Sequence, residues 1–132
     1  MRAVIFDTTI WIDYLNGVIS KETDMLYSYL EKNYKIYVCP IIVQEVLQGI
    51  KEDKVFSEIK DIFFHIDMLN LDPLEASIGA AELYRILRKK GLTIRKSNDC
   101  LIAFYALYFN IPLIHNDRDF DMISKHTKLK IK

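Results

Sequence analysis

The sequence has little of several features that would place it in a specialised class. Neither charge is in excess, because eighteen Lys and Arg residues balance eighteen Asp and Glu residues, so the overall charge indicates no particular partner. Cysteine is scarce: Cys39 and Cys100 lie in apolar surroundings, and neither has a histidine at metal-ligand spacing. We expect buried thiols in a reducing compartment rather than a disulfide or a zinc site.

Long apolar runs, linkers and glycine-rich loops are also missing. The longest apolar stretch, from Cys100 to Phe109, has ten residues and is too short to cross a bilayer. No charged-then-apolar signal segment opens the chain, so we expect a cytoplasmic protein without a membrane partner. The common phosphate-binding loops are excluded. No repeat or linker divides the sequence, which predicts that residues 1–132 form a single domain.

Short apolar runs alternate with helical patterns along the whole chain. Strands are predicted at 3–6, 36–39, 68–71 and 111–114, with a weak edge strand at 129–131. Helices are predicted at 10–15, 22–33, 53–64, 74–90 and 98–109, with another beginning at Pro40 and a short one within 117–124. This alternation predicts an α/β fold with a mainly parallel sheet and helices on both faces.

Two local details of the helices are predicted as well. Ser97 is expected to cap the helix at 98–109, since serine is a favourable N-cap residue. The small residues Gly79, Ala80 and Ala81 indicate that another element approaches the helix at 74–90 closely.

Acidic residues lie where the predicted strands end or where the connecting helices begin. Asp7 follows the first strand, and Glu45 lies about two turns into the helix after the second. Asp99 is in the first turn of the helix that precedes the last long strand, and Asp117 lies just past that strand. For Asp7 alone, capping of the next helix and a role in a site stay equally open. Because parallel strands end at one edge of a sheet, the four acids are expected to converge there.

Converging carboxylates need a cation. Two of them about 4 Å apart repel by roughly 4 kcal/mol at an effective dielectric constant near 20. Hard oxygen donors without cysteine or a well-placed histidine suit Mg²⁺ or Mn²⁺. These ions activate water and stabilise the charge that develops on a phosphate under in-line attack.

The acidic positions and their neighbours resemble the four signature motifs of PIN domains. The motifs are Asp7-Thr8-Thr9-Ile10, Glu45 in an apolar helix, SNDCLIA at 97–103 and LIHNDRDF at 113–120. The match extends from Ala3 to Ile123, and the Asp-x-Asp-Phe ending looks most like VapC-type toxins of bacterial and archaeal toxin–antitoxin operons. The resemblance implies a three-layer α/β/α fold and a Mg²⁺- or Mn²⁺-dependent ribonuclease. Such toxins are usually homodimers that a cognate antitoxin protein inhibits.

The resemblance also implies roles for single residues. The catalytic acids would be Asp7, Glu45, Asp99 and Asp117, of which Asp7, Asp99 and Asp117 would hold the metal ion.

Four neighbours of these acids would assist or stabilise the site. Thr8 or Thr9 would hydrogen-bond the first aspartate or a metal-bound water. Asp119 is either an auxiliary acid or the cap of the following helix. His115 stands where many family members have a hydroxyl residue, and a backbone partner is favoured for it over a substrate contact.

Two further stretches indicate partners. Residues 85–96 contain six basic residues and no acid, and within them Arg88, Arg95 and Lys96 are predicted to contact RNA phosphates. The adjacent Lys89 and Lys90 are explained by the C-terminal end of a helix. The apolar helices between residues 40 and 64 are expected to receive an antitoxin helix or a second subunit in a groove.

Other functions fit less well. A haloacid dehalogenase-type phosphatase needs a second aspartate two residues after Asp7, where this sequence has Thr9. A receiver domain needs a strand-end lysine that is not evident. A PIN-fold RNA-processing nuclease and a non-catalytic protein-binding module remain as alternatives. Loss of acids would favour the module, but all four acids are present.

Overall fold

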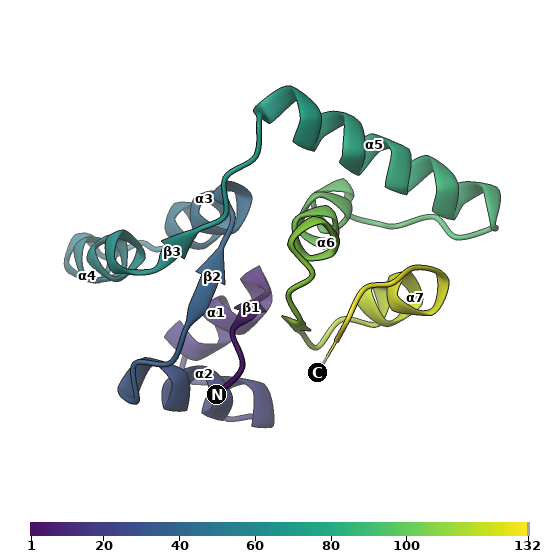
Figure 1. The fold of residues 1–132 in the computed structure, drawn as a ribbon. Coiled ribbons are helices and arrows are strands. Elements are labelled where there is room, and N and C mark those ends of the chain that lie inside the picture. The colour runs from purple at the N-terminus through teal and green to yellow at the C-terminus, as the bar shows by residue number, and fades with distance from the viewer. Residues whose placement is uncertain (132) are drawn as a thin grey trace.

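The computed structural model describes residues 1–131, in which helices and strands alternate along the chain (Figure 1). The strands are β1 (Val4–Phe6), β2 (Ile36–Val38), β3 (Asp67–Met68) and β4 (Leu113–Ile114). The helices are α1 (Thr8–Leu15), α2 (Lys21–Glu31), α3 (Pro40–Gln48), α4 (Asp53–His65), α5 (Pro73–Lys89), α6 (Ser97–Phe109) and α7 (Arg118–His126).

The strands form one parallel sheet in the order β3-β2-β1-β4, as predicted. Strand β1 is central, since Ile5 pairs with Tyr37 of β2 on one side and with Leu113 of β4 on the other. A single parallel bridge between Leu113 and Ile131 represents the predicted C-terminal edge strand. The parallel arrangement brings the carboxyl ends of β1 and β4 to the same edge of the sheet.

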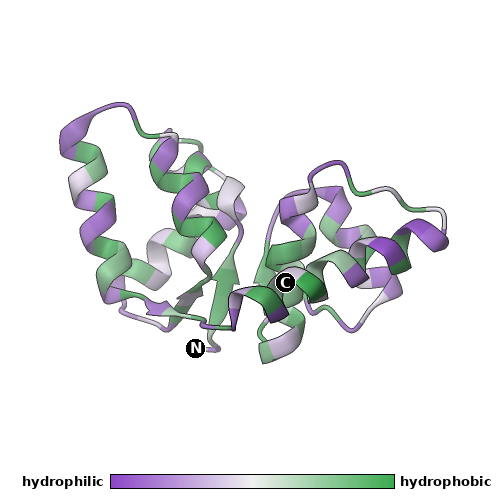
Figure 2. Cartoon of the chain, turned by 90° about the horizontal axis from the view of Figure 1, so that it is seen from above, coloured by the Kyte–Doolittle hydropathy of each residue, from purple (hydrophilic) through white to green (hydrophobic). Residues whose placement is uncertain are grey.

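Helices cover the sheet in two groups. Figure 1 shows α1 to α4 on one side of the strands and α5 to α7 on the other, and Figure 2 shows the same two groups from above, with apolar strands between them. The core follows from this layering: all three residues of β1 are fully buried, and Trp11 packs against Phe63 with ring centroids 5.0 Å apart. Among residues 1–131, no helix is both long and apolar enough to cross a membrane.

The predicted close approach to the small residues of α5 is confirmed. A methyl group at Gly79 would clash with the ring of Phe104 on α6, so a larger residue there would require the ring to move away. Helix α6 is apolar on nearly every side and buries most of its length, which fixes the position of its first turn relative to the sheet.

Some predicted boundaries are wrong because side chains and backbone compete locally. Ser97 does not cap α6: the backbone N–H of Asp99 donates to the carbonyl of Lys96 at 3.0 Å, so the helix already includes Ser97. Helix α2 begins before Glu22 because Ser20 and Thr23 form a capping box. Strand β3 lies at Asp67–Met68 rather than at 68–71.

Candidate active site

Three carboxylates meet at the edge where β1 and β4 end. Asp99, Asp117 and Asp119 form the only group of three or more acidic, histidine or cysteine side chains within residues 1–131 whose ligand atoms lie within 4.8 Å of one another. The first turn of α6 supplies Asp99, while the segment after β4 and the start of α7 supply the other two. The ends of the two strands are held together, since the backbone N–H of Asp7 donates to the carbonyl of Ile114 at 2.9 Å.

Asp99 is the most constrained of these acids. Asp99 is only 6% exposed, and its Oδ2 atom has no hydrogen-bond partner within the described part of the chain. Burial, followed by the charge of Asp7, raises the pKa of Asp99 to about 7, although Lys96 opposes the shift. A buried carboxylate oxygen without a donor favours either a proton or a cation.

Asp7 fills the first of the two roles that the sequence left open. It caps α1, and its Oδ2 accepts hydrogen bonds from the hydroxyl of Thr9 at 2.6 Å and from the backbone N–H of Thr9 at 3.4 Å. Burial still raises the pKa of Asp7. The carboxylate lies outside the triad but close enough to Asp99 for its charge to act on that group.

Asp119 lies beside Asp99 and Asp117, and the alternative in which it caps α7 is wrong. The capping residue is Asp117, whose Oδ1 accepts from the backbone N–H of Asp119 at 2.9 Å. Asp119 is therefore the second residue of α7, is buried, and completes the triad with Asp99. The sequence predicted Asp7 as the third metal ligand, whereas the closest three acids include Asp119 instead.

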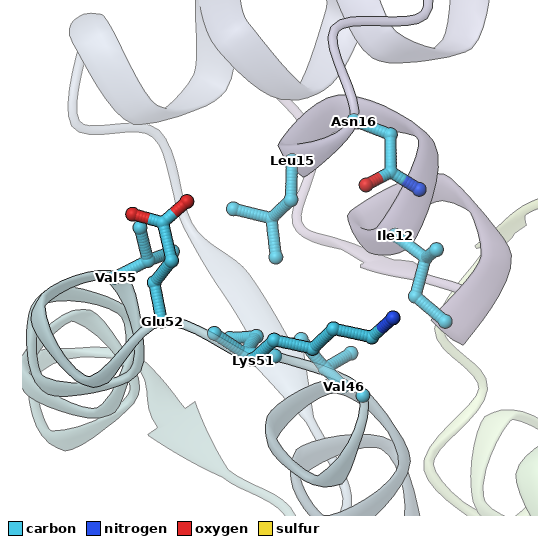
Figure 3. A pocket seen from close by; sticks show the side chains of 9 residues that line it. Ile12, Leu15, Asn16, Val46, Lys51, Glu52 and Val55 are labelled. Carbon is cyan, nitrogen blue, oxygen red and sulfur yellow. The ribbon is translucent and has the colours of Figure 1, made fainter.

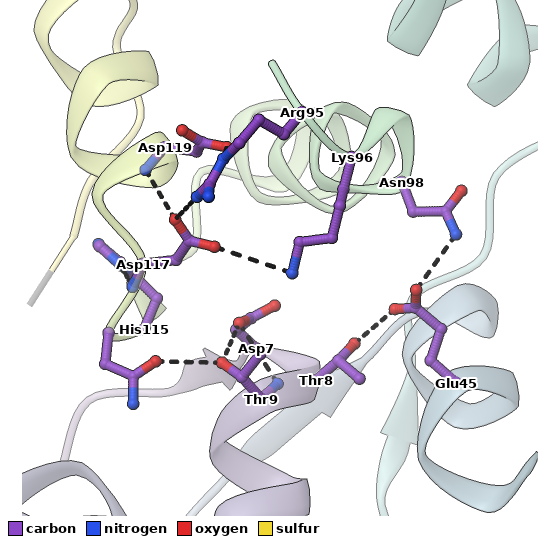
Figure 4. Close-up of polar contacts among 11 residues, drawn as sticks. Asp7, Thr8, Thr9, Glu45, Arg95, Lys96, Asn98, His115, Asp117 and Asp119 are labelled. Carbon is purple, nitrogen blue, oxygen red and sulfur yellow. Dashed lines mark hydrogen bonds and ion pairs between the residues drawn. The ribbon is translucent and has the colours of Figure 1, made fainter. Parts of the chain in front are cut away.

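Glu45 lies at the other end of the site and is held by neutral groups (Figure 4). Its Oε1 accepts from the hydroxyl of Thr8 at 2.7 Å, and its Oε2 accepts from the amide of Asn98 at 3.1 Å. Thr8 therefore bonds to Glu45, and Thr9 bonds to the first aspartate. Sequence reasoning missed Asn98, although its position directly before Asp99 was a usable signal.

Two of the basic residues predicted to contact RNA, Arg95 and Lys96, form ion pairs with the acids (Figure 4). Arg95 approaches Asp119 at 3.2 Å through Nε and Asp117 at 3.3 Å through Nη2, and Nζ of Lys96 lies 3.8 Å from Asp117. The third, Arg88, is elsewhere, with its guanidinium 5.7 Å from the ring centroid of Tyr84.

His115 has the backbone partner that was expected. The N–H of Asp117 donates to Nδ1 of His115 at 3.1 Å, and the Nε2 atom lies 3.5 Å from a carboxylate oxygen of Asp121. Asn116, which the sequence analysis did not single out, extends the network from Thr9 to Asp13, with contacts of 3.2 Å on each side.

A comparison with models of protein families identifies the family of this chain. The model of the PIN domain matches residues 4–125, which include every acid described above. The chain belongs to the PIN domain family. This PIN domain is 32% identical over 130 residues to VapC ribonuclease Mb1587 of Mycobacterium bovis and to Ribonuclease VapC11 of Mycobacterium tuberculosis, and each alignment covers 96% of both chains.

Solved structures share the fold. VapBC2 from Rickettsia felis, bound to a DNA fragment from its promoter, contains a chain with a TM-score of 0.74 at 24% identity, covering 98% of this PIN domain and 97% of that chain. VapBC-1 from nontypeable Haemophilus influenzae gives a TM-score of 0.72 at 19% identity, with coverage of 98% and 96%. The three-layer PIN-like fold predicted from the sequence is thereby confirmed.

Proposed function

We propose that this PIN domain is a ribonuclease that depends on Mg²⁺ or Mn²⁺ and acts in the cytoplasm as the toxin of a toxin–antitoxin pair. The observation that carries the proposal is the triad of Asp99, Asp117 and Asp119, with one buried oxygen that no donor among residues 1–131 satisfies. The names of the relatives, which are called ribonucleases, agree with hydrolysis of RNA.

The donor set suits a hard divalent cation. The residues that would hold it are Asp99 and Asp117, with Asp119 or Asp7 adding further oxygen ligands. When bound, such an ion activates water and stabilises negative charge on a phosphate under in-line attack. Without the ion, the charges of Asp117 and Asp119 are partly balanced by Arg95 and Lys96.

The neighbouring side chains orient the site and prepare it for an RNA strand. Thr9 fixes the carboxylate of Asp7, and Thr8 with Asn98 fixes that of Glu45. Arg95 and Lys96 are more than half exposed, so these long cations can turn from the acids towards a phosphate that enters the site.

The test is cleavage of single-stranded RNA by the purified protein. We expect cleavage with millimolar Mg²⁺ or Mn²⁺ and none with EDTA. The same ions should raise the melting temperature, because binding to the folded state adds about 2.7 kcal/mol of stability at a hundredfold excess over Kd. If neither cleavage nor the melting temperature responds to divalent ions, the alternative of a non-catalytic protein-binding module is favoured.

The antitoxin is the second part of the proposal. Helices α1, α3 and α4 surround a cavity of about 470 Å³ whose apolar lining includes Ile12, Leu15, Val46 and Val55 (Figure 3). An amphipathic antitoxin helix could place an apolar side chain there. The VapBC complexes among the similar structures support a partner of this kind.

Coexpression with the product of the adjacent gene tests the partner. We expect the two proteins to purify together, and Val55→Glu to weaken the complex because it places a charge at the partly buried lining of the cavity. We also expect the isolated protein to sediment as a homodimer and to stop growth when it is expressed alone, which an RNA-processing nuclease would not do. A monomer that binds no product of that gene would contradict this part.

A further inference from the structure

A second cavity lies between α5 and the first turn of α6 and has a different character. It measures about 520 Å³, a volume within the range of small-ligand sites. Helix α5 contributes Tyr84, Arg85 and Arg88 to its lining, and α6 contributes Ser97 and Asn98. Among residues 1–131, no carboxylate lines this cavity, so its polar groups are guanidinium groups, hydroxyls and one amide.

The two arginines have no counter-ion in the described chain. Neither Arg85 nor Arg88 approaches a carboxylate within 4.0 Å among residues 1–131, whereas Arg95 and Lys96 both pair with aspartates. Arg88 is placed instead over the ring of Tyr84, 5.7 Å from its centroid. The positive charge of the cavity is therefore available to an anion from outside the chain.

The cavity adjoins the acidic site at the start of α6. Asn98 lines the cavity and also donates to Glu45 at 3.1 Å, and Asp99 of the triad is the next residue (Figure 4). A strand whose phosphate lies at the triad would therefore meet the cavity with an adjacent nucleotide.

The opposite side of α5 shows that the charge is segregated. A cavity there is lined by Asp72, Glu75 and Glu82 together with Leu74, Ile78 and Phe104. Its carboxylates would repel a polynucleotide, so α5 offers a phosphate chain only the side that carries Arg85 and Arg88.

We propose that the cavity between α5 and α6 binds a nucleotide of the RNA substrate adjacent to the cleaved phosphodiester. Arg85 and Arg88 bind its phosphate, the base packs on Tyr84, and Ser97 and Asn98 offer hydrogen bonds to the sugar. An aromatic ring beside guanidinium groups matches single-stranded RNA better than an acidic peptide, which has no base to stack. The proposal rests on the ribonuclease function argued above.

The test measures binding of a short fluorescein-labelled single-stranded RNA by anisotropy at several salt concentrations. The Asp99→Asn background prevents cleavage during the titration. We expect Arg85→Gln with Arg88→Gln to weaken binding about tenfold and to lower the salt slope by about 0.7, since both arginines bind one phosphate and one phosphate contact on a single strand contributes about 0.7. Tyr84→Leu should weaken binding about tenfold with an unchanged slope, because stacking does not release counterions.

Lys89→Gln is the matched control, because it removes one positive charge from the same helix end without altering the cavity lining. If it weakens binding as much as Arg88→Gln alone, which is measured beside it, bulk charge explains the result and the subsite is wrong. The subsite is also wrong if the double arginine variant binds RNA like its parent while the wild type still cleaves RNA. If the wild type neither cleaves nor binds RNA, the ribonuclease function itself is wrong. Binding of polyglutamate that requires both arginines would then show that the cavity binds an acidic protein.

Discussion

Two carboxylates at opposite ends of the candidate site have opposite surroundings. Glu45 accepts hydrogen bonds from neutral groups on both oxygens, from Thr8 at 2.7 Å and from Asn98 at 3.1 Å. Asp99 has one oxygen that finds no donor among the described residues, and two other carboxylates offer oxygens within 4.8 Å. The first carboxylate is already satisfied by the fold, whereas the second stays strained until a proton or a cation arrives.

The comparison indicates where a metal ion contributes most. Neutral donors stabilise the charge of Glu45 without any ion, so Glu45 should contribute little to binding the cation. At the triad, burial and the neighbouring carboxylates both disfavour the charge of Asp99, and a divalent ion would offset both effects. Substitutions at the two ends should therefore differ in size and in their dependence on metal.

The largest effect is expected for Asp99→Asn. Asparagine keeps the size of the side chain but removes one anionic ligand, so cleavage of RNA should fall by more than about a hundredfold. In EDTA the variant should melt at or above the wild-type temperature, because a repulsive charge is gone. The measurement pairs kcat/KM on one RNA with thermal melts. Wild-type cleavage by a folded variant would show that the triad is not catalytic.

The pH dependence of the metal-free protein is the next largest effect. An unfolded aspartate has a pKa near 4, whereas that of Asp99 in the folded protein is about 7. Between these values the folded state keeps a proton that the unfolded state has lost, so stability falls as the pH rises, and the loss is complete above pH 7. Asp7, whose pKa is also raised, adds an effect of the same sign.

We therefore expect the protein in EDTA to be about 2 kcal/mol less stable at pH 8 than at pH 5. Urea unfolding at the two pH values measures the difference. Asp99→Asn is the control, since it should remove most of this dependence. A protein that becomes more stable from pH 5 to pH 8 in EDTA would contradict the strain assigned to Asp99.

The positions of the acids could be predicted from the sequence because they depend on local patterns. Asp7 directly follows an apolar strand, and Asp117 lies shortly after another, so a parallel sheet suffices to bring them to one edge. The alternating strand and helix patterns were also sufficient to predict the order of the elements and the parallel sheet.

The contacts among side chains could not be predicted in the same way. Arg95 and Asp119 are 24 residues apart, and their pairing depends on how α6 and α7 pack. From the sequence, Arg95 was predicted only as a phosphate ligand, and whether Asp119 caps α7 stayed open. The backbone N–H of Asp119 donates to Asp117 at 2.9 Å, which makes Asp117 the cap. This bond depends on α7 beginning at residue 118, which the sequence pattern did not determine.

Glu45→Gln should have a smaller effect than Asp99→Asn. The glutamine carbonyl can still accept from the hydroxyl of Thr8, and Asn98 can turn its own carbonyl towards the new amide. We expect a stability change below about 1 kcal/mol, as for the loss of one net hydrogen bond, and about a tenfold fall in kcat/KM. The assay is run beside that of Asp99→Asn on the same RNA. Equal losses in the two variants would remove the distinction between the two ends of the site.

The smallest effect is expected for Arg95→Gln, which tests the triad from the side of its counter-ion. The Arg95 side chain is 61% exposed, so its pairs with Asp117 and Asp119 should contribute less than about 1 kcal/mol to the stability of the metal-free protein. Its removal should tighten Mn²⁺ binding a few-fold in calorimetry, because the ion no longer competes with a guanidinium for the same oxygens. Lys89→Gln removes an equal charge from the end of α5 and should leave the affinity nearly unchanged. Weaker Mn²⁺ binding by Arg95→Gln would mean that the arginine organises the carboxylates for the metal rather than competing with it.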